Sequence, residues 1–207
     1  MAKLKINALV PDSNNFLEPF DGDVAFGNHS ASSATFLETS GDGDYYVLKG
    51  RGFSYDGSTL LHGTITSVTF FNSEGVSYAQ VTGLALNAAR LERNPDIDLG
   101  DLMEKAMRGA DRVLGSAGDD FLIGFAGNDV FTGGKGSDRF YCDSRGNDVI
   151  TDFDAKGGGD EQDYVSVGAG GTTVRDGKNT VYQYENGHTL TFIGVRYTDL
   201  DVGDFIF

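Results

Sequence analysis

The segment from residue 45 to residue 91 alternates hydrophobic and polar residues in a pattern that predicts β-strands. Val, Ile, Thr, Tyr and Phe are concentrated in three runs, and Asp-Gly or Glu-Gly pairs close the first two of them. β-Branched and aromatic residues bounded by turn residues are typical of strands. We therefore expect a small sheet or roll built from the runs 45–57, 63–75 and 76–91.

Outside this segment the N-terminal part has no such pattern. Residues 1–43 are polar and predict irregular structure, with Asp-Gly-Asp at 21–23 and 42–44. These two triplets are expected to be turns, because neither continues into the loop of an EF-hand, which needs a bidentate Glu at its twelfth position.

A short amphipathic helix is predicted after the strands. Asn94-Pro95 ends the β pattern, and Asp98 is suited to cap a helix. The run ends at Gly109, and its apolar residues recur at helical spacing: Leu99, Leu102, Met103, Ala106 and Met107.

The C-terminal part predicts an acidic loop followed by a hairpin. The loop, 152–163, is either solvated or holds a capping ion on four aspartates: Asp152, Asp154, Asp160 and Asp163. Beyond it, the apolar stretches TVYQYE and TLTFIGV flank Asn186-Gly187, a pair that favours a tight hairpin turn.

Between the helix and this loop the sequence repeats with a nonapeptide period. The repeat places glycine, aspartate and an apolar residue at constant spacing: Gly109, Asp111 and Val113; Gly118, Asp120 and Leu122; Gly127, Asp129 and Phe131; Gly136, Asp138 and Phe140. After a slip of one position near Cys142, the pattern recurs at Gly146, Asp148 and Ile150.

This spacing is suited to a parallel β-roll, in which each unit is a tight turn plus a short strand and two successive units complete a coil. Glycine permits the turn and the close stacking of coils, while the apolar residue points inward. Aspartates of alternate units then lie about 4.8 Å apart along the sheet. Two such carboxylates repel by roughly 3 kcal/mol at an effective dielectric near 20, and a hard cation between them reverses the sign.

Composition supports a cationic partner. The chain has 31 acidic and 16 basic residues, a formal charge of -15, which argues against nucleic acid or an anionic membrane. Residues 96–163 alone hold 16 acidic and 7 basic residues. No apolar run approaches the length of a membrane span. The lone Cys142 excludes an internal disulfide, which fits a cytosolic protein and equally fits a secreted one that is stabilised by metal.

The units GSAGDDFLI, GFAGNDVFT and GGKGSDRFY resemble the nonapeptide repeats of the RTX (repeats-in-toxin) family. That resemblance implies a parallel β-roll that binds Ca²⁺, with backbone carbonyls and one aspartate from each of two turns that are separated by one full coil. It also implies an extracellular protein exported by type I secretion machinery.

Carried over to this chain, the resemblance implies three sites. The first pairs Ser116, Gly118 and Asp120 with Gly133, Lys135 and Asp138. The second pairs Met107, Gly109 and Asp111 with Gly124, Ala126 and Asp129. The third pairs Phe125, Gly127 and Asp129 with Asp143, Arg145 and Asp148. The missing glycines at 106–107 set the second site apart from the consensus, and the slip near Cys142 does so for the third.

The C-terminus extends the resemblance. Residues 146–167 resemble the post-repeat segment of RTX proteins, and 189–207 resemble their closing hairpin. The N-terminus, MAKLKINALVPDSNN, lacks the apolar region of a signal peptide, whereas Asp204 followed by three apolar residues resembles an uncleaved type I signal. Alternatively, residues 205–207 simply form an edge strand that closes the core.

No catalytic motif is present. His29, His62 and His188 form no zinc-protease helix, and residues 52–57 miss the glycine that a nucleophile elbow requires, because Asp56 stands there. Cys142 is expected to be a small buried residue. We therefore expect a non-catalytic extracellular protein that contacts a cell surface or polysaccharide. The alternative is an exoenzyme, or the carrier module of a polysaccharide-modifying enzyme.

The predicted fold is all-β: a short calcium β-roll flanked by an N-terminal β-domain, one short helix and a C-terminal β-hairpin cap. The expected boundaries are 1–95 for the N-terminal domain, 96–108 for the helix, 109–151 for the roll and 152–207 for the cap with its secretion signal.

Overall fold

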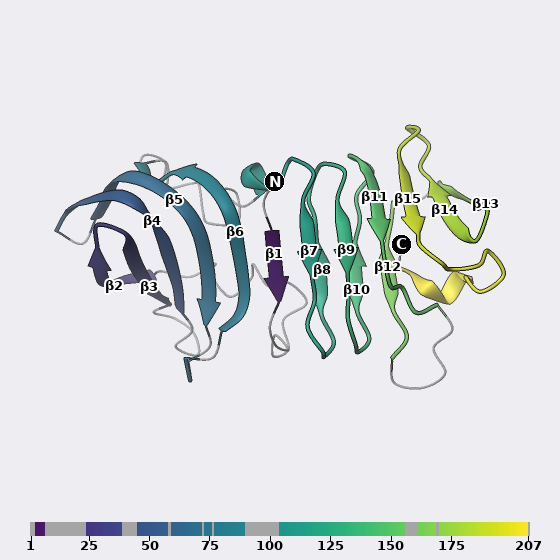
Figure 1. The fold of residues 1–207 in the computed structure, drawn as a ribbon, viewed down its shortest axis with the longest axis horizontal. Helices are drawn as coiled ribbons and strands as arrows, with labels where there is room; N and C mark the ends of the chain where they lie inside the picture. The colour runs from purple at the N-terminus through teal and green to yellow at the C-terminus, as the bar shows by residue number, and fades with distance from the viewer. Residues whose placement is uncertain are drawn as a thin grey trace. The chain divides into compact units, whose positions relative to one another are not determined.

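The chain forms two compact units, which a computed structural model describes for part of the sequence. One unit contains residues 10–106, and the other combines residues 3–9 with 107–207. The described residues are 3–6, 24–38, 45–57, 59–71, 73–75, 77–89, 104–155, 161–168 and 170–206. The all-β prediction is confirmed, because strands dominate both units (Figure 1).

The N-terminal unit is a five-stranded antiparallel meander in the order β6-β5-β4-β3-β2. Its strands are β2 (Val24–Ser30), β3 (Ser33–Glu38), β4 (Tyr45–Asp56), β5 (Thr59–Phe71) and β6 (Ser77–Asn87). The last three are the strands that the hydrophobic pattern predicted. Leu48, Ile65, Val68, Phe70 and Val81 are fully buried and form the centre of this unit's core.

The prediction that residues 1–43 are irregular is wrong for 24–38 and for 3–6. β2 and β3 contain few consecutive apolar residues, so their sequences give a weak strand signal. β3 instead pairs with the long strand β4 from Ser33↔Lys49 to Leu37↔Tyr45, and β2 pairs with β3. Strand formation here follows from the neighbouring strand, because β propensity depends on context. The triplets 21–23 and 42–44 lie outside the described residues.

The C-terminal unit is a parallel β-roll with two sheets. Successive strands of the repeats enter the sheets alternately. One sheet contains β7 (Arg112–Leu114), β9 (Val130–Thr132) and β11 (Asn147–Ile150), and the other contains β8 (Phe121–Ile123), β10 (Arg139–Tyr141) and β12 (Tyr164–Ser166). Figure 1 shows these pairs following one another along the unit in sequence order.

The pairing register confirms that two nonapeptide units complete one coil. Arg112 pairs with Val130 in the first sheet, and Phe121 pairs with Arg139 in the second. The inward apolar positions are confirmed as well, since each is fully buried: Val113, Leu122, Phe131, Phe140 and Ile150. Within the core the rings of Phe131 and Phe140 meet edge to face, with centroids 6.1 Å apart.

The roll continues beyond the repeats. β15 (Thr189–Phe192) adds in parallel to β11, and β16 (Phe205–Ile206) adds in parallel to β12. β1 (Lys3–Ile6) adds in parallel to β7 at the other end of that sheet, so it belongs to this unit and not to the N-terminal domain in which the sequence placed it.

The predicted hairpin around Asn186-Gly187 is confirmed, while the predicted closing hairpin over 189–207 is wrong. β14 (Asn179–Gln183) pairs antiparallel with β15, and β13 (Thr172–Asp176) pairs antiparallel with β14. β15 and β16 lie in different sheets, because each extends the parallel register of the roll strand before it. β16 is an edge strand, as the alternative for 205–206 predicted; Phe207 lies outside the described residues.

The predicted helix is described only at its end. Residues 104–106 are helical and Met107 is fully buried, whereas 90–103 lie outside the described residues. In the described part of the chain no helix is long and apolar enough to cross a membrane.

Glycine permits the coils to stack closely. At two glycines this steric effect can be tested without backbone strain. A Cβ at Gly146 would collide with the Gly127 carbonyl oxygen of the preceding coil, while a Cβ at Gly109 would meet nothing within 4 Å. Neither residue has a left-handed φ.

We therefore predict that Gly146→Ala destabilises the calcium-loaded protein by roughly 1–3 kcal/mol, the usual cost of overpacking. Gly109→Ala is the matched control and should leave the thermal midpoint nearly unchanged. Equal midpoints for the two variants in calorimetric unfolding would contradict the close stacking.

Candidate metal centre

The aspartates of the repeats stack in two columns, one along each side of the roll. The first column contains Asp111, Asp129 and Asp148, and the second contains Asp120, Asp138 and Asp163. All six are buried, with 1–5% of their surface exposed.

A hydrogen bond joins each aspartate to the next in its column. In the first column the Asp111 N–H donates to Asp129 Oδ1 at 2.9 Å, and the Asp129 N–H donates to Asp148 Oδ1 at 2.9 Å. In the second column the Asp120 N–H donates to Asp138 Oδ1 at 3.0 Å. The carboxylates of Asp129, Asp138 and Asp148 thus each use one oxygen to hold the neighbouring coil in register.

The other carboxylate oxygen faces the turns. Asp129 Oδ2 is buried and has no hydrogen-bond partner among the described residues. It lies where a Cβ on Gly124 would stand, and Asp138 Oδ2 lies likewise at Gly133. A buried carboxylate oxygen without a donor is costly unless a cation neutralises it, so this geometry fits a hard, oxygen-seeking metal ion.

Burial of the column carboxylates also shifts their pKa values. Burial, and then the neighbouring carboxylates, raise the pKa of Asp129 and of Asp148 to about 7 and that of Asp138 to about 8. The pKa of Asp120 is also raised, chiefly by burial, although hydrogen bonds from Ser116 oppose the shift. Near neutral pH and without a cation, the folded columns therefore keep protons that the aspartates of an unfolded chain have already released.

Backbone carbonyl oxygens lie between successive turns, where the remaining ligands of an ion would be needed. A Cβ on Gly134 would touch the Ser116 carbonyl oxygen, and a Cβ on Gly127 would touch that of Gly109. In the described residues no three His, Cys, Asp or Glu side chains converge on one point, so an ion would depend on such carbonyls.

At the first predicted site the structure brings four of the six residues together. Asp120 faces Asp138 through the column, and Ser116 donates to the Asp120 carboxylate through its N–H at 2.5 Å and through its hydroxyl at 3.1 Å. Gly133 contacts the Asp138 side chain, whereas Gly118 bonds to the Ser116 hydroxyl and Lys135 is exposed.

At the second predicted site Asp111 and Asp129 are joined in the column, with Gly124 against the Asp129 carboxylate and Gly109 in the adjacent turn. Met107 is fully buried, and Ala126 is half-buried in the turn before Gly127.

At the third predicted site the extra residue near Cys142 does not break the column. β11 pairs with β9 at Val149↔Val130, one position more than a regular coil, and Asp129 remains bonded to Asp148. Phe125, which stands where the consensus has glycine, adopts φ 61°, the left-handed conformation that glycine favours.

The other predicted residues of the third site lie in the turn before β11. The side chains of Arg145 and Asp143 form an ion pair at 2.5 Å there, which leaves the predicted role of their backbone carbonyls untested. The extra residue is accommodated in this turn, where Cys142 is buried as predicted and its carbonyl accepts from the Tyr184 hydroxyl at 2.9 Å.

The second column has a further member that the sequence analysis did not place there. Asp138 donates its N–H to Asp163 Oδ1 at 2.9 Å, and the Asp154 N–H donates to Asp163 Oδ2 at 2.8 Å. The signal was present, because Asp163 and the buried Val165 have the spacing of aspartate and apolar residue in the repeats.

Backbone donors also satisfy the neighbouring acidic loop. Asp152 accepts from the Gly133 N–H at 2.9 Å and from the Gly134 N–H at 3.0 Å. Both oxygens of Asp152 and of Asp163 thus accept N–H groups, and the capping ion on this loop stays a prediction. Asp160 lies outside the described residues.

Comparison with known proteins agrees with this geometry. Residues 106–140 match the sequence model of the RTX calcium-binding nonapeptide repeat, in four copies. No curated protein matches the chain. The chain therefore carries calcium-binding repeats in the segment that contains Asp111, Asp120, Asp129 and Asp138 of the two columns.

We predict that Asp120→Ala and Asp138→Ala each weaken or abolish one calcium site, because each removes a column carboxylate and leaves its partner buried. Asp129→Ala should affect two sites, since Asp129 stands between Asp111 and Asp148. Asp111→Ala should have a smaller effect. Titration calorimetry with calcium tests this order.

Asp176→Ala is the matched control, because Asp176 is exposed at the end of β13 and belongs to neither column. A larger effect for Asp111→Ala than for Asp120→Ala would contradict the ranking, and would show that the second site is the principal one.

Proposed function

We propose that this chain is a secreted protein that folds when calcium binds its repeats, and that it acts outside the cell as a non-catalytic binding protein. The observation that carries the proposal is the pair of buried aspartate columns in a segment of calcium-binding repeats. Ca²⁺ is the expected ion, since carboxylate and carbonyl oxygens are the ligands it prefers.

Calcium concentration would then control folding. In a cytosol with submicromolar calcium, the columns lack the cation that offsets their repulsion, and the chain stays unfolded. Outside the cell, calcium is roughly millimolar, which suits sites with a Kd of about 10⁻⁴ to 10⁻³ M. Binding to the folded state alone stabilises it by mass action.

A non-catalytic role is supported by the placement of the histidines. His29 lies on β2 against Tyr55, His62 is exposed on β5, and His188 lies in the turn before β15. No observation in the described residues favours the alternative of an exoenzyme or its carrier module.

Export through type I secretion machinery is the remaining part of the proposal. An acidic chain without disulfides is suited to threading while unfolded. Its C-terminal residues would be read in that state and would then pack as β16, so signalling and edge-strand roles are compatible.

The folding step gives a prediction with a pH dependence. The folded-state pKa values of Asp129, Asp138 and Asp148 lie above the ordinary value near 3.9, so the stability that protonation gives the calcium-free fold is present at low pH. That stability is lost as pH rises from about 4 through 8.

Circular dichroism tests the calcium dependence of folding and its pH dependence. The protein is first stripped of metal on a chelating resin. At pH 8 the calcium-free protein should lose much of its β-signal, and 5 mM calcium, about the upper extracellular range, should restore it. At pH 5.5 the difference should shrink. Identical spectra and melting temperatures with and without calcium at pH 8 would refute metal-dependent folding.

Export gives a second prediction. Deleting residues 180–207 should abolish secretion from a host with type I machinery, while deleting residues 1–40 should not. The truncated chain could be missing from the medium because it is degraded. A reporter fused to residues 152–207 is therefore the control, and this fusion should reach the medium. Truncated chain in the medium at the full-length level would contradict a C-terminal signal.

A further inference from the structure

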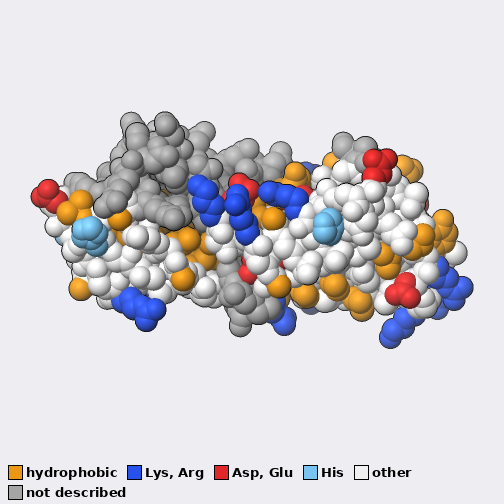
Figure 2. Space-filling view, turned by 90° about the horizontal axis from the view of Figure 1, so that it is seen from above, with side chains coloured by type: hydrophobic (Ala, Val, Ile, Leu, Met, Phe, Trp, Pro, Cys, Tyr) orange, Lys and Arg blue, Asp and Glu red, His pale blue; other side chains and the backbone are white. Residues whose placement is uncertain are grey.

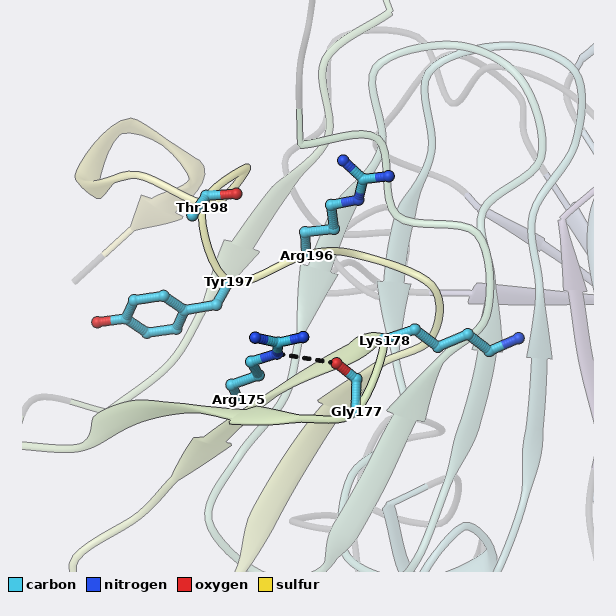
Figure 3. A pocket seen from close by; sticks show the side chains of 6 residues that line it. All are labelled: Arg175, Gly177, Lys178, Arg196, Tyr197 and Thr198. Carbon is cyan, nitrogen blue, oxygen red and sulfur yellow. Dashed lines mark hydrogen bonds between the residues drawn. The ribbon is translucent and has the colours of Figure 1, made fainter.

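The C-terminal unit has a basic surface pocket outside the aspartate columns. It is lined by Arg175, Gly177, Lys178, Arg196, Tyr197 and Thr198 and has a volume of about 690 Å³ (Figure 3). This volume lies within the roughly 300–1,000 Å³ that small-molecule sites occupy. The lining comes from two segments, the β13–β14 turn and the loop after β15.

Hydrogen bonds fix these two segments to each other. Gly194 donates its N–H to Asn179 Oδ1 at 2.9 Å, and the buried Thr180 hydroxyl donates to the Val195 carbonyl at 2.9 Å. Val195 is itself buried, so the exposed residues 196–198 that follow it start from an anchored backbone. The pocket is therefore built on a rigid support, which lowers the entropy that binding would cost.

The cations of this pocket have no acidic partner. In the described part of the chain no carboxylate forms an ion pair with Arg175, Lys178 or Arg196. Asp176 follows Arg175 on the same strand, so the two side chains point to opposite faces of the sheet. In a chain with a formal charge of -15, three uncompensated cations around one pocket are unexpected unless they meet an anion.

Arg175 is oriented for such an anion. Its Nε donates to the Gly177 carbonyl at 3.1 Å, which fixes the guanidinium and leaves both terminal nitrogens available. Figure 3 shows this guanidinium below the backbone of Arg196 and Tyr197, whose side chains, like that of Lys178, extend away from it in different directions. A fixed guanidinium can bind a carboxylate or sulfate through two parallel hydrogen bonds.

Tyr197 restricts the chemical class of the ligand further. Its side chain is 49% exposed beside the two arginines, an unusual exposure for a ring that could be buried. An exposed aromatic ring next to arginine in the sequence suits a ligand with one apolar face and polar edges, such as a sugar ring. Figure 2 shows lysine and arginine side chains beside hydrophobic ones at the right-hand end of this unit.

We infer that this pocket binds an acidic saccharide, with Arg175 and Arg196 on the carboxylate or sulfate and Tyr197 on the sugar ring. The inference rests on the proposed extracellular binding role and places that role in the C-terminal unit. A long nucleic acid does not fit, since the rest of the chain would repel it.

Titration calorimetry of the full calcium-loaded chain at low salt tests the inference with three probes. Trigalacturonate and a heparin-derived tetrasaccharide carry carboxylate and sulfate groups, and fully methyl-esterified trigalacturonate is the neutral control. Free calcium is matched in cell and syringe, because uronates bind calcium themselves. At least one acidic probe should bind, and the ester should not.

Variants then locate the site. Arg175→Gln with Arg196→Gln should weaken binding of the acidic probe at least about tenfold, and so should Tyr197→Ala. Tyr197→Phe should retain binding, because it keeps the ring. Arg51→Gln, an exposed cation on β4 in the N-terminal unit, is the matched control and should bind as wild type does.

The outcomes separate the pocket from the wider role. Acidic-probe binding that is unchanged in the double arginine variant would refute the pocket while leaving polysaccharide binding intact. Binding of only neutral sugars on a glycan array would do the same. A folded, calcium-loaded protein that binds no glycan at all would refute both.

Discussion

Repulsion between buried carboxylates is the interaction on which the rest of the C-terminal unit depends. Stacking the coils brings aspartates of alternate repeats into two columns and removes them from water, although each carries a charge at neutral pH in the unfolded chain. The backbone N–H of one aspartate stabilises one oxygen of the next in the column, but Asp129 Oδ2 has no hydrogen-bond partner among the described residues. A cation between the turns would supply the remainder, and under the proposed function this would couple the fold to the metal.

The columns end where the protein supplies donors of its own. Asp163 accepts N–H groups from two sides, and Asp152 accepts from Gly133 and Gly134. The coil that follows the repeats is thus joined to them by backbone hydrogen bonds to Asp152 and Asp163. That coil gives the repeat strands a neighbour whose own backbone is already paired.

The sequence predicted the repeats well because their period is strict. Glycine, aspartate and an apolar residue at fixed offsets determined the two-unit coil and the buried row from Val113 to Ile150. The C-terminal strands were harder to place, since β15 pairs with β11 across a long intervening stretch of chain and a sequence pattern does not encode such a distance. β2 and β3 were missed because β4 determines their conformation. The basic pocket was missed because its arginines come from separate segments.

The alternation of strands between two sheets limits how such a chain can change in length. Each nonapeptide sends its strand to the sheet opposite to that of the preceding one, so losing a single unit would exchange the sheets of every later strand. Val165 and Leu190 would then have to pack from the wrong side, and the β13–β14 hairpin would leave its own sheet. Losing two units preserves the arrangement. The whole coil, and not the single nonapeptide, is therefore the smallest step by which this architecture can change in length and keep every later strand in its sheet.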